Sequence, residues 1–278
     1  TAPLAKINAT RALGARVVIH GASLEEARAE AFAIADREGR IFVPPFDDDA
    51  VIAGQGTVGL ELVRQAPDVN EVLVPAGGGG LLAGVALALK HLRPGIRVIG
   101  VQSAAMDGIA RSLAAGKPVA VGATRTIADG VAVSGPSERT FALIQRYVDE
   151  VVTVPDEAIA QAILALVERA KFVVEGAGAL GIAAVMSGRY RPKGKALAVI
   201  SGGNIDIYVY SNFWKWGGGD PATGFGVEFS SGHFSIDGCT QAIRYASLAK
   251  KRLRFTPYGV SPHRQEHVES IPGGSTAT

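Results

Sequence analysis

Helix-like and strand-like hydrophobic patterns alternate along the first two hundred residues of the chain. Short apolar runs rich in β-branched residues predict strands, and apolar residues three and four positions apart predict helices between them. Strands are predicted at 16–20, 41–43, 97–101, 151–154 and 196–201, and in the run that begins at Val72. Helices are predicted at 4–13, 23–37, 49–65, 81–92, 156–171 and 177–186. This alternation is typical of an α/β fold in which helices cover both faces of a twisted, mostly parallel sheet.

Local signals add detail to two of these helices. Ser23 and Glu26 match a capping box, which would open the helix over 23–37. The helix over 49–65 contains Gly54-Gln55-Gly56-Thr57. We expect this segment to interrupt the helix, because glycine weakens a helix interior.

The composition changes near residue 207. Residues 207–278 hold most of the aromatic side chains, including both tryptophans, and Gly217-Gly218-Gly219 breaks any long helix. A helix is predicted at 240–254, and the end, 271–278, is expected to be disordered. We therefore place a boundary near residue 207 and leave the segment after it unassigned.

Four consecutive glycines, Gly77–Gly80, form the most informative stretch for function. They follow the apolar run Val72-Leu73-Val74-Pro75 and precede an Ala/Leu-rich helix. A glycine turn between a strand and a helix lets several backbone N–H groups converge on one point, and the helix N-terminus adds partial positive charge. We expect a phosphate site here. The alternative is a tight turn that binds no ligand.

Charge and cysteine content narrow the class of protein. The formal net charge is +2, which argues against a nucleic-acid or polybasic membrane surface. A single cysteine, Cys239, cannot form an internal disulfide, so the cytoplasm is the expected compartment. The sequence has no signal-peptide pattern and no window that approaches the roughly 18 apolar residues of a membrane-spanning helix. We expect a soluble protein.

Two nucleotide-binding classes compete for the glycine turn. Gly78-x-Gly80-x-x-Ala83 fits the dinucleotide fingerprint of an NAD-dependent dehydrogenase. That fold needs an acidic residue at the end of the next strand, about 20 residues on, and here Gln102 stands there. No Gly-Lys-Ser/Thr follows the glycines, so a P-loop enzyme is disfavoured.

A zinc-protease pattern occurs near the end of the chain. His263-Arg264-Gln265-Glu266-His267 matches H-x-x-E-H. Two histidines and a glutamate still need a third protein ligand and a supporting fold, so a solvated polar tail is the better account. We expect no metal site.

A second glycine turn, Ser201-Gly202-Gly203-Asn204, follows the last predicted strand. Together with Ile52–Thr57, Ile127–Val131 and Val174–Leu180, it completes a distinctive set of motifs. In order and spacing, this set resembles the pyridoxal-phosphate-dependent threonine/serine dehydratases and serine racemases of the tryptophan-synthase-β-like fold. The resemblance covers residues 1–206 and implies pyridoxal 5′-phosphate as the cofactor.

The resemblance also implies roles for particular residues. Gly77–Gly80 would hold the cofactor phosphate, and Ser201 would offer its hydroxyl to the pyridine nitrogen. Gly130 would border the ring, Glu175 would lie near the cofactor, and Asn204 would lie beside Ser201. A neutral hydroxyl makes the ring a weaker electron sink than a carboxylate would, which suits loss of a β-hydroxyl group.

Structural alternatives exist for several of these side chains. Ser201 could cap a helix or turn, and Glu175 could be a carboxylate favoured by the macrodipole at a helix N-terminus. Gln55 lies in the matching Gly-Gln-Gly-Thr segment and could equally serve helix packing.

The catalytic lysine of the family has no counterpart in this sequence. In the family, a lysine within Ser-x-Lys-x-Arg-Gly forms the Schiff base, and a Ser-Gly-Asn-His loop binds the substrate carboxylate. Neither segment occurs here, and Lys6, Lys90 and Lys171 lie outside the required context. We therefore assign no catalytic residue and expect the chain as written to be inactive or nearly so.

Gln102 separates two branches of the family. In the racemase branch a glutamate at this position binds a divalent metal, and a neutral amide is a poor ligand for a hard cation. The resemblance therefore favours a dehydratase that converts L-threonine to 2-oxobutanoate and ammonia, with L-serine as a second substrate. It implies a role in isoleucine biosynthesis and a homo-oligomeric full-length form. The alternatives are a non-catalytic phosphate-binding remnant, a racemase-type isomerase and a dehydrogenase.

The resemblance also divides the chain. Residues 1–48 match the later half of a smaller subdomain, so the fold is expected to be incomplete at the N-terminus. Residues 49–206 would form the large cofactor-binding subdomain, and 207–278 have no counterpart.

Overall fold

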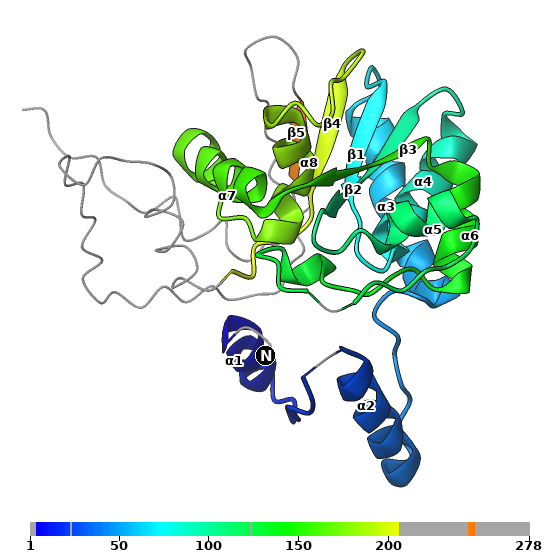
Figure 1. Cartoon of the computed structure of the whole chain (residues 1–278), viewed down its shortest axis with the longest axis vertical. Helices are drawn as coiled ribbons and strands as arrows, with labels where there is room; N and C mark the ends of the chain where they lie inside the picture. The colour runs from blue at the N-terminus through cyan, green and yellow to red at the C-terminus, as the bar shows by residue number, and fades with distance from the viewer. Residues whose placement is uncertain (1–3, 23, 123, 206–243, 248–278) are drawn as a thin grey trace, which may run out of the picture.

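A single β-sheet organises the described part of the chain. The computed structural model describes residues 4–22, 24–122, 124–205 and 244–247 (Figure 1). The strands are β1 (Glu71–Pro75), β2 (Arg97–Ser103), β3 (Glu150–Val154), β4 (Ala196–Ile200) and β5 (Arg244–Ser247), in the spatial order β3-β2-β1-β4-β5. The first four run parallel, with Val72 opposite both Val98 and Leu197, and β5 pairs antiparallel with β4. The predicted α/β fold with a mostly parallel sheet is confirmed.

Helices cover both faces of this sheet (Figure 1). One face carries α3 (Asp49–Gln65), α4 (Gly80–Leu92), α5 (Gly108–Ala115) and α6 (Glu138–Tyr147). The other carries α7 (Asp156–Ala165), which continues as a π-helical turn over Leu166–Ala170, and α8 (Gly176–Met186). Two helices near the N-terminus, α1 (Leu4–Ala12) and α2 (Leu24–Glu38), precede this layered body.

Alternating side chains divide the core into two layers. In β1, Leu73 packs with α7 and α8, whereas Val72 and Val74 pack with α3 and α4. Successive strand side chains point to opposite faces, so both sets are buried only because both faces carry helices. Every residue of β1 is buried. This burial explains why the central strands are continuous apolar runs.

Six predicted helices are present, and two helices of the described chain escaped prediction. The helices predicted at 4–13, 23–37, 49–65, 81–92 and 177–186 correspond to α1, α2, α3, α4 and α8, and 156–171 corresponds to α7 with its π turn. The missed helices, α5 and α6, are short. A signal for α6 existed: Ser137 and Thr140 form a capping box, and Phe141 and Ile144 supply its buried face.

The strands predicted at 16–20 and 41–43 are wrong. Both segments lack regular secondary structure, and no backbone hydrogen bond joins either one to another described segment. A strand needs a neighbour to satisfy its backbone groups, and apolar alternation alone cannot supply one. Val18 and Ile41 accordingly remain exposed, at 50% and 91%.

Most of the divergent C-terminal segment lies outside the described residues. The boundary near 207, the predicted disorder of 271–278 and most of the helix predicted at 240–254 fall there. Within that predicted helix, residues 244–247 form β5, so the helix prediction is wrong at these four positions. Strand β4 would otherwise present an open edge, and pairing with β5 satisfies its backbone groups.

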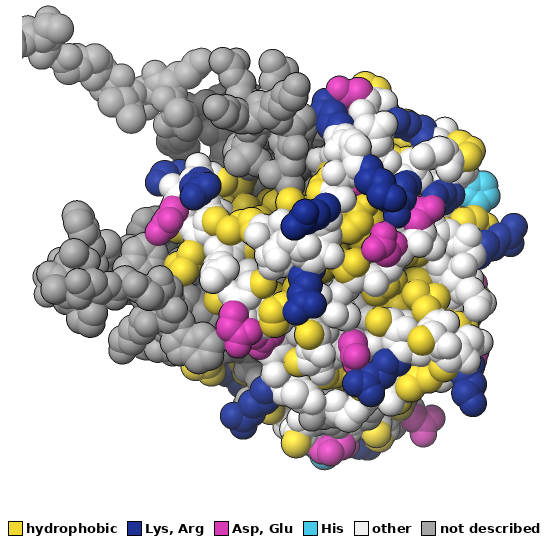
Figure 2. Space-filling view, turned by 45° about the horizontal axis from the view of Figure 1, so that its top comes forward, with side chains coloured by type: hydrophobic (Ala, Val, Ile, Leu, Met, Phe, Trp, Pro, Cys, Tyr) yellow, Lys and Arg dark blue, Asp and Glu magenta, His cyan; other side chains and the backbone are white. Residues whose placement is uncertain are grey.

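The surface view shows no large single-sign patch on its visible face. Basic and acidic side chains are interspersed over the described residues there (Figure 2). Among those residues, no helix combines the length and apolar content needed to cross a bilayer.

Close glycine contacts fix α3 against α4. A Cβ at Gly84 would overlap the Ile52 carbonyl oxygen and lie 2.8 Å from the Gly56 nitrogen. A Cβ at Gly59 would lie 2.8 Å from that of Ala88. The interruption expected at 54–57 does not occur, because α3 is continuous over Asp49–Gln65. Gly56 and Gly59 are buried against α4, whereas Gly54 is exposed. The backbones can therefore approach closely, which places the N-terminus of α4 against the sheet.

Replacing Gly84 tests this packing. Because the added methyl group meets backbone atoms, we expect Gly84→Ala to destabilise the protein by about 1–3 kcal/mol. The matched control is Gly54→Ala, where a Cβ meets nothing within 4 Å. There alanine should stabilise the helix by up to about 1 kcal/mol. Urea unfolding measures both, and equal stabilities for the two variants would contradict the packing argument.

Candidate functional site

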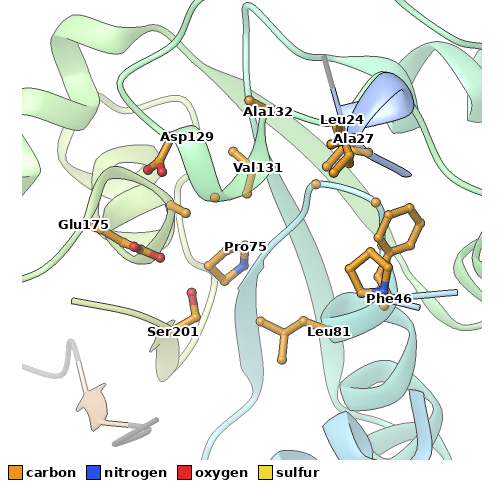
Figure 3. A pocket seen from close by; sticks show the side chains of 18 of the residues that line it. Leu24, Ala27, Phe46, Pro75, Leu81, Asp129, Val131, Ala132, Glu175 and Ser201 are labelled. Carbon is orange, nitrogen blue, oxygen red and sulfur yellow. The ribbon is translucent and has the colours of Figure 1, made fainter. Parts of the chain in front are cut away.

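A cavity of about 670 Å³ opens at the carboxyl ends of β1 and β4. Its wall includes Gly77–Gly80 after β1, Ser201 after β4, the loop Asp129–Val133, and Glu175 at the start of α8. The carboxyl edge of a parallel sheet is where α/β folds usually bind ligands. In Figure 3 the oxygens of Asp129, Glu175 and Ser201 gather on one side, and Phe46 lies on the other.

The glycine turn has the features of an anion cradle. Gly79 caps the N-terminus of α4 with φ +95°, a conformation that favours glycine. Among the described residues, the backbone N–H groups of Gly77–Gly80 have no hydrogen-bond partner. Free N–H groups at the positive end of a helix dipole suit a phosphate.

Only glycine fits in this turn. A Cβ at Gly77 would lie 2.8 Å from the Val131 Cα, and one at Gly80 would lie 2.6 Å from the Phe46 carbonyl oxygen. A Cβ at Gly78 would lie 2.5 Å from the Phe46 ring. At Gly77 and Gly80 the neighbouring backbone therefore leaves no space for a side chain, and at Gly78 the Phe46 ring would have to move. The cradle fits a phosphate group.

Thr140 anchors the turn from α6. Its hydroxyl donates to the Gly78 carbonyl oxygen at 2.8 Å, and the residue is fully buried. The same hydroxyl accepts from the Ser137 backbone N–H in the capping box. Thr140 is not among the site residues predicted from the sequence. The segment Ser137-Glu138-Arg139-Thr140 before an apolar face is nevertheless a signal for a helix start.

Asp156 holds the loop that borders the cavity. Its carboxylate accepts from the Thr126 hydroxyl at 2.6 Å and from the Ile127 backbone N–H at 2.9 Å. The bonded residues come just before the single helical turn Asp129–Val131 in the sequence. Gly130, in this turn, lines the cavity. A Cβ at Gly130 would lie 2.9 Å from that of Ala177 and 3.2 Å from the Glu175 carboxylate.

Glu175 lies at the N-cap position of α8, and only 13% of its side chain is exposed. One carboxylate oxygen, Oε2, is buried and has no hydrogen-bond partner among the described residues. A Cβ at Gly202 would overlap the other oxygen, so the Ser201-Gly202-Gly203 turn and this carboxylate fit together only with glycine at 202. Glu175 is therefore both a carboxylate at the positive end of the α8 dipole and a part of the cavity wall.

An ammonium group partly balances this carboxylate. Lys6 Nζ lies 2.7 Å from Asp129 Oδ2 and 3.7 Å from Glu175 Oε2. Burial raises the pKa of Glu175, and the charge of Lys6 opposes that rise without cancelling it. Burial alone would lower the pKa of Lys6, but its bond to Asp129 and the charge of Glu175 outweigh this, so the pKa is raised. Lys6 is therefore held as a cation.

The structure brings most of the predicted site residues together. Gly77–Gly80, Gly130, Glu175 and Ser201 all line the same cavity, and so does Gln55. Asn204 does not line it, and the residue is exposed. Lys6 is not among the predicted site residues, yet it contacts Asp129 and Glu175 in the wall of this cavity.

Gln102 is fully buried at the end of β2. Its amide nitrogen donates to the Met106 carbonyl oxygen at 3.1 Å, and its amide oxygen accepts from the Ala110 N–H at 2.9 Å. Both ends of the Gln102 amide are therefore hydrogen-bonded to the backbone that follows β2. The described residues contain no cluster of side chains able to hold a metal ion, and the His263–His267 pattern lies outside them.

Fold and cavity together define an α/β protein with a phosphate cradle and a neutral hydroxyl at adjacent strand ends. The chain belongs to the family of pyridoxal-phosphate dependent enzymes, whose family model matches residues 1–202. Pyridoxal phosphate is thus the cofactor of its family.

Within this family, the chain is similar to proteins that are named for their action on L-threonine. The chain is 51% identical over 207 residues to the L-threonine ammonia-lyase of Thermotoga maritima, covering 74% of this chain and 51% of the relative. It is 46% identical over 209 residues to the catabolic L-threonine dehydratase of Escherichia coli, covering 74% and 64%. The chain thus spans about half of the first protein's length and less than two thirds of the second's.

Solved structures agree with this placement. The processed form of threonine deaminase isoform 2 from Solanum lycopersicum matches with a TM-score of 0.72 at 36% identity, covering 78% of this chain and 61% of that one. The serine racemase of maize matches with a TM-score of 0.70 at 32% identity, covering 77% and 67%. The structural neighbours therefore include a threonine deaminase and a serine racemase, the two branches that the position of Gln102 was expected to separate.

Glu175→Gln tests the electrostatics of the cavity. A carboxyl with a raised folded-state pKa costs stability when ionised, and this cost disappears as the pH falls through that pKa. We therefore expect Glu175→Gln to raise Tm at about pH 8, with a gain that shrinks toward about pH 5. Scanning fluorimetry over this range measures the effect. The exposed Glu168, changed to Gln, is the control, and an equal shift in both variants would refute the assignment.

Proposed function

We propose that this chain forms the cofactor-binding part of an L-threonine ammonia-lyase, which converts L-threonine to 2-oxobutanoate and ammonia. L-Serine, which would give pyruvate, is the second substrate. The observation that carries the proposal is that the N–H groups of Gly77–Gly80 at the N-terminus of α4 have no hydrogen-bond partner within the described part of the chain. They lie in the cavity that Ser201 also lines. Relatives at 46–51% identity carry the ammonia-lyase and dehydratase names.

Each part of the cavity has a task in this proposal. The glycine N–H groups would hold the phosphate, and Ser201 would donate a hydrogen bond to the pyridine nitrogen without adding negative charge. When bound, the cofactor withdraws electrons from the α-carbon of the amino acid. Glu175 and Gly130 would border the ring, and the bonds from Asp156 hold the loop that forms this side of the cavity.

Two residues favour ammonia-lyase over racemase chemistry. Gln102 has both amide ends engaged within the protein and offers no carboxylate for a divalent cation. Ser201 supplies a neutral partner to the ring, which suits departure of the β-hydroxyl group over a long-lived carbanion.

The 278 residues do not include the lysine segment Ser-x-Lys-x-Arg-Gly. Lys6 reaches the cavity wall, but it is a cation paired with two carboxylates and therefore a poor nucleophile. We infer that this chain alone binds the cofactor reversibly and does not turn threonine over.

Further parts of the proposal concern the whole protein. The subdomain division at residues 48 and 206, a homo-oligomeric full-length form and a cytoplasmic location stay predictions.

A role in isoleucine biosynthesis is one of two metabolic settings, since the Escherichia coli relative is named a catabolic enzyme. Kinetics of the full-length protein with isoleucine added would distinguish these settings.

Calorimetry with two cofactor forms tests the phosphate cradle. We expect pyridoxal phosphate to bind at least about tenfold, or about 1.4 kcal/mol, more tightly than pyridoxal, because only the former carries a phosphate. Gly80→Ala should remove this preference, since its Cβ meets the Phe46 carbonyl oxygen. Gly95→Ala, where a Cβ meets nothing within 4 Å, should retain it. Equal affinity for both forms, or preferential binding of a nicotinamide dinucleotide, would overturn the proposal.

A non-catalytic phosphate-binding protein is the second candidate, favoured by the intact cradle without its lysine. Borohydride reduction in the presence of the cofactor should leave no lysine labelled in the dehydratase position, as mass spectrometry would show. Adding a polypeptide that carries the lysine segment of the Thermotoga maritima relative should then restore threonine turnover. Cofactor binding without any such rescue would favour the second candidate.

A further inference from the structure

Three charged side chains from separate parts of the chain meet at one wall of the cavity. Lys6 comes from α1, Asp129 from the turn after residue 128, and Glu175 from the start of α8. The Lys6 ammonium bonds directly to Asp129 at 2.7 Å and lies 3.7 Å from Glu175. Its side chain is one-third exposed, whereas that of Glu175 is mostly buried. The cluster therefore has a solvent side and a buried side.

Without the ammonium, two carboxylates would face each other. Both approach the same nitrogen closely, and like charges at such a separation disfavour joint ionisation. The charge of Asp129 already contributes to the raised pKa of Glu175. An uncompensated pair would place negative charge in the same cavity as the cradle of Gly77–Gly80. Lys6 reduces this charge where an anion must enter.

The same lysine lies where α1 meets the cavity. Ile7 is the buried residue of α1 among those described, and it lines the cavity. Leu4 is 62% exposed. A nine-residue helix is marginal by itself in water, so its position depends on such tertiary contacts. Lys6 and Ile7 together join α1 to the body of the protein.

We propose that Lys6 is a positioning residue that ties α1 to the cavity wall and holds Asp129 and Glu175 in place. The claim that Lys6 aids binding of an anionic cofactor rests on the proposed function. The claim that Lys6 stabilises the positions of α1 and of the Asp129 turn does not. The role requires a cation at this position and not merely a long side chain.

Hydrogen exchange of the ligand-free protein tests the proposal. Lys6→Met should accelerate exchange in α1 and in residues 128–131 by about two- to fivefold, the range of a partly exposed ion pair. Lys6→Arg should restore protection because the charge returns. Arg11→Met removes a cation from the same helix at an exposed position and is the matched control. Equal exchange in Lys6→Met and Arg11→Met would overturn the proposal.

A double-mutant cycle shows whether Lys6 acts through the two carboxylates. In the Asp129→Asn/Glu175→Gln background, Lys6→Met should change exchange in residues 128–131 far less than it does in the native background. An undiminished effect in that background would mean that Lys6 acts through packing alone, which contradicts the proposed role.

Titration with pyridoxal phosphate separates this proposal from the proposed function. Lys6→Met should weaken binding more at low salt than at high salt, because charge neutralisation is screened by ions. Arg11→Met should not. If the native chain binds no cofactor but exchange distinguishes Lys6→Met from Arg11→Met, the proposed function fails and the Lys6 role stands. If the native chain binds the cofactor but hydrogen exchange is the same in Lys6→Met and Arg11→Met, the proposed role of Lys6 fails.

Discussion

The close approach of backbone segments around Gly77–Gly80 is the constraint on which the site depends. The turn passes so near Phe46 and Val131 that a β-carbon has no space there. Glycine is also required between α3 and α4, where Gly84 allows the backbones of the two helices to come into contact. Together these contacts place the N-terminus of α4 at the carboxyl end of β1. The turn's N–H groups and the helix dipole therefore act at one place.

Electrostatics divides the cavity into two functional regions. The α4 N-terminus supplies positive potential without a charged side chain, because the partial charges reside on fixed backbone groups. The opposite region contains Glu175 and Asp129, whose charges Lys6 partly balances. Ser201 lies at the end of β4 and adds a hydroxyl without charge. In the proposed function, an anionic phosphate and a neutral contact to the ring nitrogen would be served by different strand ends of the same sheet.

The sequence allowed the parallel sheet, its central strands and the glycine cradle to be predicted. Residues far apart in sequence, such as Gly130, Glu175 and Ser201, could be grouped because their motifs occur in a known order. Apolar alternation could not show whether 16–20 and 41–43 have a pairing partner, since pairing is a tertiary property. Thr140 and Lys6 were missed because they act through contacts with residues more than sixty positions away. No local pattern records such contacts.

The most direct test of the phosphate cradle is to observe its backbone N–H groups while the cofactor is added. Two-dimensional ¹H–¹⁵N NMR of the native chain during titration with pyridoxal phosphate reports each amide separately. The cradle predicts that the amides of Gly77–Gly80 show the largest shifts and move downfield, as expected for donors to an anion. Saturable binding that leaves these four amides unchanged would contradict the cradle.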